Sequence, residues 1–214
     1  MAVFVDGFNL YHAIAELGAD HLKWVDLWKL SEVFVSPPQE LVAVYYFSAY
    51  ATWLPGPLDR HQRYVRALEA RGVTAVMGYF KEKERHCKLC RQSTRGHEEK
   101  ETDVNAALWM LDQGYQGTYD RALLISNDSD LVPPIRMLQL RFPKLPVRVI
   151  VPPLRRHSKE LAQIVGKKNL RSIKRIHIER SLLPEKVYDK AGKLVAKRPG
   201  SYAPPPPPPT TKRT

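Results

Sequence analysis

Residues 3–12 read VFVDGFNLYH, and this stretch decides the fold class. The apolar run over 2–5 has no alternating polar positions and is too short for a stable helix, so we predict a strand that is buried on both faces. The run stops at Asp6, and a helical pattern follows over 9–17. A buried strand that passes directly into a helix is typical of α/β proteins.

The same alternation of strand and helix continues along the chain. Strands are predicted over 2–5, 41–48, 73–79, 122–126 and 147–151, with a further edge strand beginning at Leu170. Helices are predicted between them over 9–17, 25–34, 57–71, 103–112, 131–140 and 158–165. We therefore predict a three-layer α/β fold in which a mainly parallel sheet of five or six strands lies between helices.

The length and composition indicate one domain with a packed core. The chain has 214 residues, of which 43% are hydrophobic, and this is enough to fill one ordinary domain. The longest apolar runs fall well short of the roughly 18 residues that a membrane-spanning helix needs. The N-terminus lacks the basic-then-apolar order of a secretory signal. We therefore expect a soluble, cytoplasmic protein with no membrane association.

The net charge of +12 is distributed unevenly. Residues 167–214 hold 13 Lys and Arg against 3 Asp and Glu, so residues 1–166 are nearly neutral. Basic side chains gain free energy by releasing counterions from phosphates, which favours a polyanionic partner bound partly by the C-terminal part. A tail that serves only to keep the protein in solution is the alternative.

Acidic side chains gather where the predicted strands end. Asp6 follows the first strand, Asn9 lies three residues later, Asp103 opens a helix, and Asp128 and Asp130 follow the fourth strand. The carboxyl ends of parallel strands meet at one edge of a sheet, so we expect these side chains to converge. Capping of a helix explains Asp103 or Asp128 taken singly. Converging carboxylates, however, repel one another without a cation, and oxygen ligands suit Mg²⁺ or Mn²⁺.

Three stretches in this order resemble the NYN domain, a branch of the PIN-like nuclease superfamily. They are VFVDGFNLYH at 3–12, KETDVNAALWML at 100–111 and YDRALLISNDSDLVPPIRML at 119–138. The resemblance covers about residues 1–165. It implies a PIN-like, Rossmann-like fold and a metal-dependent ribonuclease, an endonuclease that hydrolyses the phosphodiester bonds of RNA.

The resemblance also implies roles for individual residues. Asp6, Asp103 and Asp128 look like the metal-binding acids of the family, with Asn9 and Asp130 as supporting catalytic residues. The family's further acid, on a helix between the first and third motifs, has no clear counterpart here. Glu69 is the only residue in a suitable place, and we do not assign it to the site.

The domain division follows from the motifs and the composition. We predict a nuclease domain over 1–178 and a basic, Pro-rich C-terminal tail over 179–214 that is partly disordered. A small hairpin around 189–192 is expected within this tail, and the six prolines at 204–209 predict an extended polyproline segment.

Neutral and basic side chains near the acids predict contacts to substrate. Ser126 is suited to orienting water or RNA, and Lys100, three residues before Asp103, is placed to contact a phosphate. An exposed lysine without a ligand is the ordinary alternative. Lys81 and Arg85 belong to a basic segment that is expected to form a cationic rim for RNA beside the acids.

Cys87 and Cys90 have the two-residue spacing of half a zinc site. His97 or His86 could complete a structural Zn²⁺ site together with them, although His86 and Cys87 are adjacent and could not both bind without strain. A single pair of this kind is a weak signal, so reduced surface thiols and a redox pair stay open.

Two other enzyme classes with similar sheets are disfavoured. A haloacid dehalogenase-type phosphatase needs a second aspartate two residues after the first, and position 8 is Phe8. Dinucleotide binding needs a glycine-rich turn that DGFN does not provide. A non-catalytic RNA-binding or scaffold module that retains the fold remains the alternative to a nuclease, and a homodimer is left open.

Overall fold

The computed structural model describes residues 1–86 and 92–206. Seven strands form one sheet in the order β4-β3-β2-β1-β5-β6-β7, and every neighbouring pair is parallel except β3 and β4. The strands are β1 Ala2–Asp6, β2 Ala43–Ala49, β3 Thr74–His86, β4 Ser93–Lys100, β5 Ala122–Ile125, β6 Val147–Val151 and β7 Leu170–Ser172. The prediction of an α/β fold with a mainly parallel sheet is confirmed.

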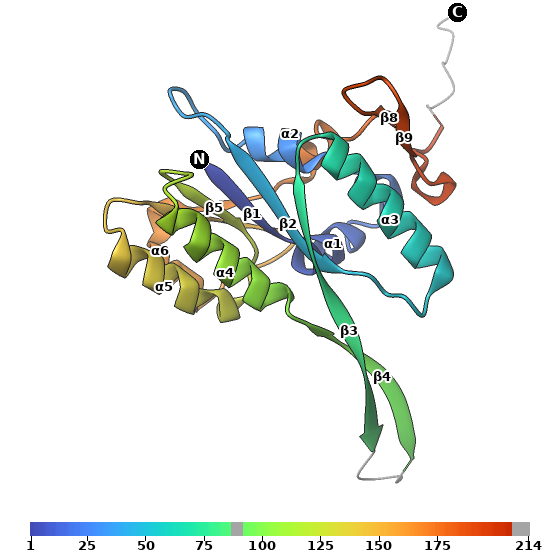
Figure 1. The fold of residues 1–214 in the computed structure, drawn as a ribbon, viewed down its shortest axis with the longest axis horizontal. Coiled ribbons are helices and arrows are strands. Elements are labelled where there is room, and N and C mark those ends of the chain that lie inside the picture. The colour runs from blue at the N-terminus through green and yellow to red at the C-terminus, as the bar shows by residue number, and fades with distance from the viewer. Residues whose placement is uncertain (87–91, 207–214) are drawn as a thin grey trace, which may run out of the picture.

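Helices cover both faces of this sheet (Figure 1). They are α1 Gly7–Ala15, α2 Leu27–Glu32, α3 Pro55–Ala70, α4 Thr102–Tyr115, α5 Val132–Arg141, α6 Lys159–Val165 and α7 Arg175–Glu179. Val3 and Val5 of β1 belong to the hydrophobic core under α1, α2 and α3, whereas Phe4 belongs to the core under α4, α5 and α6. A strand between two cores has no polar face, which explains its continuous apolar sequence.

The predicted number of five or six strands was wrong, because β4 was missed. Strand β3 runs past Tyr79 to His86 and pairs with β4 in an antiparallel hairpin that projects away from the helical layers (Figure 1). Residues 93–100 read STRGHEEK, and no apolar period marks them as a strand. A ribbon that leaves the core loses the burial pattern from which strands are recognised.

The chain beyond Glu179 packs on the domain. The Trp24 indole Nε1 donates a 2.8 Å hydrogen bond to the Pro184 carbonyl, and Tyr202 is buried in the same core as Trp24. Strands β8 Lys186–Tyr188 and β9 Leu194–Lys197 form a hairpin against α3. The division of the chain at residue 178 stays a prediction based on composition. The contacts described here join residues on both sides of that boundary.

Within residues 1–86 and 92–206, no helix combines the length and the apolar character needed to cross a bilayer.

Candidate metal centre

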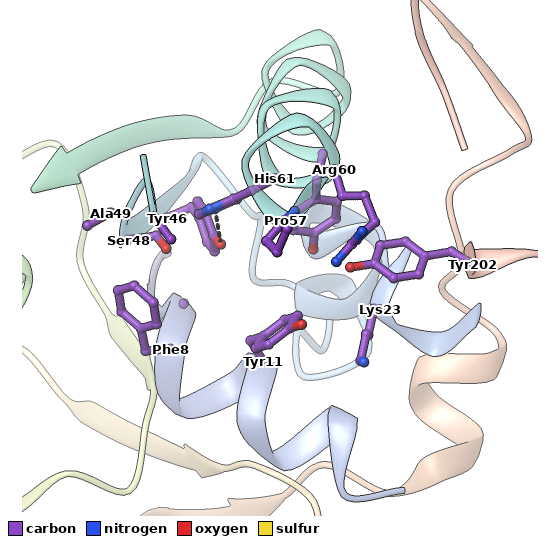
Figure 2. A pocket seen from close by; sticks show the side chains of 13 residues that line it. Phe8, Tyr11, Lys23, Tyr46, Ser48, Ala49, Pro57, Arg60, His61 and Tyr202 are labelled. Atoms are coloured by element: carbon purple, nitrogen blue, oxygen red, sulfur yellow. Dashed lines mark hydrogen bonds between the residues drawn. The ribbon is translucent and has the colours of Figure 1, made fainter. Parts of the chain in front are cut away.

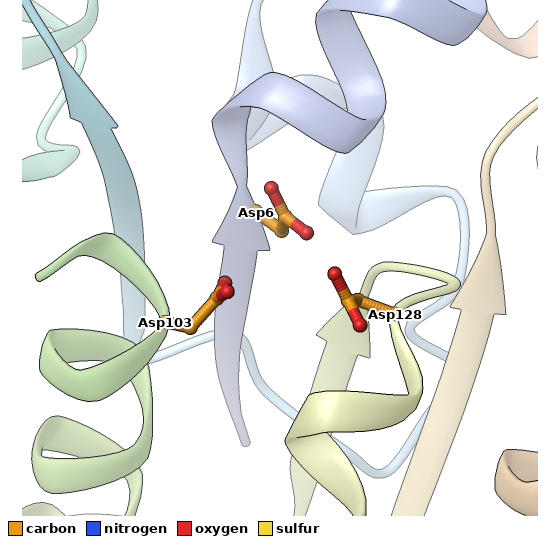
Figure 3. Close-up of side chains that lie close together, drawn as sticks. All are labelled: Asp6, Asp103 and Asp128. Carbon is orange, nitrogen blue, oxygen red and sulfur yellow. The ribbon is translucent and has the colours of Figure 1, made fainter. Parts of the chain in front are cut away.

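Three aspartates from distant parts of the chain meet at the carboxyl edge of the sheet (Figure 3). Asp6 ends β1, Asp103 lies in the first turn of α4, and Asp128 follows β5. One carboxylate oxygen from each lies within 4.8 Å of the others. Strands β1 and β5 are parallel neighbours, so their ends place Asp6 and Asp128 side by side.

Asp6 is a buried carboxylate with 6% of its surface exposed. Its Oδ1 accepts a 3.0 Å hydrogen bond from the backbone amide of Asn9, and its Oδ2 accepts one of 2.8 Å from the Ser126 hydroxyl. Burial raises the pKa of Asp6, while these two hydrogen bonds act in the opposite direction and the charge of Asp128 adds to the rise. Each carboxylate oxygen has two lone pairs, so both oxygens keep capacity for a cation.

Asp128 combines a capping role with a place in the cluster. Its Oδ1 accepts a 2.9 Å hydrogen bond from the Asp130 amide at the start of a 3-10 helix, Ser129–Leu131. Its own amide donates to the Ser126 hydroxyl at 3.0 Å. The capping explanation is therefore correct for Asp128, but it does not exclude a ligand role, because the same carboxylate lies beside Asp6 and Asp103.

Asp103 is half-buried, and burial raises its pKa to about 6, with Asp6 and Asp128 as the next causes. Repulsion among three neighbouring carboxylates thus makes it unfavourable for all three to be ionised at once. A divalent cation among them would reverse this effect. The donor set contains only hard oxygen atoms, which fits Mg²⁺ or Mn²⁺.

A close backbone contact holds the helix of Asp103 in place. A Cβ atom built on Gly78 of β3 would clash with the Lys100 carbonyl and would lie 3.1 Å from the Thr102 hydroxyl. Only glycine allows β3 to approach the start of α4 this closely. The residue before the helix, Glu101, has a left-handed backbone with φ 74°, which turns the chain from β4 into α4.

Glu99 is a fourth acid near the cluster that the sequence interpretation missed. Its Oε1 accepts a 3.0 Å hydrogen bond from the Thr102 amide, so Glu99 caps α4 at its N-terminus. Its charge contributes to the raised pKa of both Asp6 and Asp103. Glu69, the only residue that could match the family's further acid, lies exposed near the end of α3. Glu99 belongs to the acidic run just before TDVN in the sequence. Its place at the site could be predicted only if β4, the strand that carries it, had been recognised.

The acids line a cavity of about 230 Å³ that is open to solvent. The residues around it in the described part of the chain are Asp6, Phe8, Asn9, His12, Glu99, Asp103, Asp128 and Arg155. His12 and Arg155 were not predicted. Arg155 forms an ion pair with Glu16 at the cavity wall, and it brings one positive charge to an otherwise acidic site.

Asn9 and Ser126 lie at the site but act on the protein itself. The Asn9 side-chain carbonyl accepts a 3.1 Å hydrogen bond from the Asn127 amide. Ser126 is fully buried under Asp6 and does not line the cavity. The hydrogen bonds of both residues fix the loop that carries Asp128. Asp130 is exposed beside this loop.

The predicted basic contacts lie outside the acidic cavity. Lys100 forms an ion pair of 3.0 Å with Glu98, and Lys81 is exposed on β3. Arg85 belongs to β3, and its side chain is outside the part that the structure describes. Their contact with RNA stays a prediction.

Of the proposed zinc ligands Cys87, Cys90 and His97, His97 alone lies among the described residues. Cys87 and Cys90 lie outside these residues. The His97 ring stacks on the Trp53 ring at a centroid distance of 3.5 Å and an angle of 4°. In the hairpin His97 pairs with Glu82 of β3. Glu82 precedes His86, the residue next to Cys87, by four positions, which is about 13 Å along the strand at roughly 3.3 Å per residue. The zinc site stays a prediction.

The mainly parallel sheet and the acids at its carboxyl edge define the class of protein as an α/β protein with a carboxylate cluster. The NYN domain model matches residues 1–163. The chain therefore belongs to the NYN domain family, within the PIN-like nuclease superfamily.

Two known proteins are similar to this chain. The first is 6-hydroxy-3-succinoylpyridine 3-monooxygenase HspA of Pseudomonas putida, 24% identical over 172 residues that cover 64% of this chain and 54% of the relative. The chain thus spans about half the length of that protein. The second is the crystal structure of a Vibrio parahaemolyticus protein of unknown function, VPA0982, with a TM-score of 0.55 and 20% identity over 85% of this chain and 94% of that one. This likeness shows the fold alone.

Proposed function

We propose that the protein is a metal-dependent ribonuclease that hydrolyses phosphodiester bonds of RNA internally. The convergence of Asp6, Asp103 and Asp128 within 4.8 Å carries this proposal. Family membership supports a nuclease, and the all-oxygen donor set supports one Mg²⁺ or Mn²⁺ ion.

The side chains of the site have complementary roles in this function. Asp6, Asp103 and Asp128 would hold the cation, which would supply charge neutralisation at the phosphate and lower the pKa of a water molecule. Ser126 and the Asn9 amide hold the Asp6 carboxylate in its orientation. Arg155 lies at the cavity wall and donates from both terminal nitrogens to Glu16, so a phosphate oxygen would share this guanidinium group with that carboxylate.

RNA is the proposed partner, held beside the site by the hairpin β3–β4. This hairpin carries Lys81, Lys83 and Lys100, and Glu98 pairs with the last two. Lys81 therefore offers the least compensated charge of these three lysines. The basic segment after residue 166 would add affinity that depends on salt.

A cleavage assay separates this function from a non-catalytic RNA-binding module. Labelled single-stranded RNA is incubated with Mg²⁺ or Mn²⁺ and the wild type, Asp103→Asn or the control Asp112→Asn. Asp112 lies on the same helix, where its carboxylate accepts from Gln116 at 2.8 Å, away from the cavity. We expect Asp103→Asn to lose at least about 100-fold in rate and the control to match the wild type.

EDTA should abolish cleavage by the wild type. RNA binding without cleavage in every variant would support the scaffold alternative, and equal cleavage by wild type and Asp103→Asn would reject the assigned site. The monooxygenase activity named for the Pseudomonas relative is not carried over, because the chain spans only about half of that protein.

A further inference from the structure

A second cavity, of about 140 Å³, is shown in Figure 2 and shares Phe8 with the wall of the acidic one. Four tyrosines and two other rings contribute to its wall: Phe8, Tyr11, Tyr46, His61, Tyr64 and Tyr202. They come from α1, β2, α3 and the C-terminal 3-10 helix Gly200–Tyr202. An aromatic lining of this density favours a flat, unsaturated ligand over an aliphatic one.

The cavity is closed at one side by the C-terminal segment. Tyr202 is 8% exposed, and its ring reaches the rim together with Tyr11 and Lys23 (Figure 2). The Lys23 ammonium lies 5.4 Å from the centroid of the Tyr11 ring and 6.0 Å from that of Tyr202. A wall of the cavity is therefore built from a segment beyond the region that the NYN domain model matches.

The size of the cavity admits one ring. A cavity of roughly 150 Å³ accommodates benzene, so a space of about 140 Å³ fits a single six-membered ring. A purine has two fused rings and would project from this space, which is partly open to solvent. Among nucleobases, the pyrimidines match it.

Polar groups in the wall match the edge of a pyrimidine. The Tyr46 hydroxyl and His61 Nε2 form a 3.1 Å hydrogen bond with each other, and the Ser48 hydroxyl also lines the cavity. Burial lowers the pKa of His61 to about 4, so its ring is neutral at pH 7. Its Nε2 is hydrogen-bonded to Tyr46, and the hydroxyl groups of Tyr46 and Ser48 keep donor and acceptor capacity for a ligand. The amide-like edge of uracil or cytosine needs this combination.

The charges at the rim favour a phosphate. Lys23 and Arg60 both line the cavity, and the facing acid, Asp20, forms a 2.6 Å ion pair with Lys23. Two positive charges and one negative charge leave a net positive rim. A nucleotide can place its base among the rings and its phosphate at this rim.

The two cavities share a wall at Phe8. Gly7 and Phe8 follow Asp6 directly, so the aromatic cavity begins one residue away from the proposed metal ligand. A Cβ atom built on Gly7 would lie 2.6 Å from the Phe47 carbonyl oxygen and 2.6 Å from the Tyr46 ring, which shows how tightly this turn packs against β2. Phe8 therefore lies in the wall of both cavities, and the aromatic cavity is next to the acids.

We propose that the aromatic cavity binds one unstacked pyrimidine base of the RNA, beside the phosphate that is cleaved. The inference rests on the proposed ribonuclease function and names its substrate preference. Tyr11 and Tyr202 stack on the base, Tyr46, Ser48 and His61 bind its edge, and Arg60 contacts its phosphate. Bases that leave the stack are commonly held in this way by aromatic pockets.

The test uses the full-length protein and two mononucleotides as probes. Calorimetric titrations with uridine 5′-monophosphate and adenosine 5′-monophosphate are made in EDTA, so no metal and no turnover are involved. We expect the uridine nucleotide to bind at least about 10-fold more tightly than the adenosine nucleotide. Tyr202→Ala should weaken uridine nucleotide binding about 10-fold, since one base stack contributes that order of free energy. Arg60→Gln should weaken it by about the same factor through loss of a charge-assisted contact to the phosphate.

Tyr188→Ala is the matched control for the tyrosine, because Tyr188 is 50% exposed on β8 and does not line the cavity. Its melting temperature and that of both variants are measured first, and Arg60→Gln covers the case in which Tyr202→Ala fails to fold. Equal affinity for the two nucleotides, or unchanged uridine nucleotide binding in both cavity variants, would overturn the inference.

Cleavage products separate this inference from the function on which it rests. On RNA of mixed sequence, the wild type should cut beside pyrimidines, and Tyr202→Ala should cut with less preference. Metal-dependent cleavage without any base preference would leave the ribonuclease standing and reject the pocket. Selective uridine nucleotide binding in a protein that cuts no RNA would reject the ribonuclease and retain the pocket.

Discussion

The Ser126 hydroxyl donates a 2.8 Å hydrogen bond to Oδ2 of Asp6, so the end of β5 fixes a carboxylate at the end of β1. The same oxygen atom of Ser126 accepts a 3.0 Å hydrogen bond from the Asp128 amide. One buried serine therefore sets the positions of two of the three acids. It is a positioning residue, since it lies beneath the cavity and not in its wall.

Ser126→Ala should weaken the binding of Mn²⁺ about 10-fold, because groups that orient metal ligands typically contribute this much to affinity. The variant should also lose about 1 kcal/mol of unfolding free energy, because the buried Asp6 keeps one partner fewer. Calorimetric Mn²⁺ titration and urea unfolding measure the two effects. Ser129→Ala, on the exposed side of the same loop, is the control. Unchanged Mn²⁺ affinity in Ser126→Ala would show that Asp6 needs no such support.

Asp103→Asn should raise the melting temperature of the metal-free protein at pH 7. Burial and neighbouring acids raise the folded-state pKa of Asp103 from 3.8 to about 6. Protonated Asp103 therefore stabilises the folded state relative to the unfolded state. This contribution to the unfolding free energy is complete below pH 3.8 and is lost as the pH rises through about 6. The neutral asparagine does not suffer the loss, so the advantage of the variant should be full at pH 7 and absent below pH 4. Thermal unfolding in EDTA at several pH values measures it. An advantage that is the same at pH 4 and pH 7 would contradict the crowding of the acids.

Gly78→Ala should destabilise the protein by about 1–3 kcal/mol, the usual cost of forcing an extra carbon into a packed place. The added Cβ would push the Lys100 carbonyl away and move the start of α4. Asp103 moves with this turn, so Mn²⁺ affinity should fall as well. Gly200→Ala is the control, because a Cβ there meets no atom within 4 Å. Wild-type stability and affinity in Gly78→Ala would show that the contact relaxes freely.

Truncation after Glu179 should destabilise the domain. A tail that contributed only charge could be removed without this loss of stability. The deletion removes the Pro184 carbonyl that pairs with Trp24 and the buried side chains of Leu183, Val187 and Tyr202. A truncation after Pro206 retains these contacts and is the control. Urea unfolding and the salt dependence of RNA binding are compared between the two. Equal stability would mean that the segment folds on the surface without supporting the core.

The acids were predictable because each follows a feature that sequence patterns reveal. Buried parallel strands have continuous apolar sequences, and the residue after such a strand lies at the carboxyl edge. Asp6 and Asp128 could be placed in this way. Asp103 could be placed at the start of a helix. Its closeness to Asp6 and Asp128 could be predicted only with the order of the strands in the sheet known.

Glu99 and the aromatic cavity could not be predicted, because they depend on packing between distant segments. Glu99 reaches the site through β4, a polar strand outside the core. Tyr202 reaches the cavity from a segment whose Lys and Pro content resembles that of an unfolded tail. In that segment a few apolar side chains, such as Val187, provide the contact with α3, and the average composition does not show them.

Diffraction from crystals soaked in MnCl₂ tests most directly whether the three aspartates hold one cation. We predict a single anomalous peak at the carboxyl edge of the sheet, with oxygen atoms of Asp6, Asp103 and Asp128 close to it directly or through bound water. The peak should disappear in crystals of Asp103→Asn and persist in those of Asp112→Asn. Soaked wild-type crystals with no peak among the three carboxylates, or with manganese bound only elsewhere, would contradict the metal site.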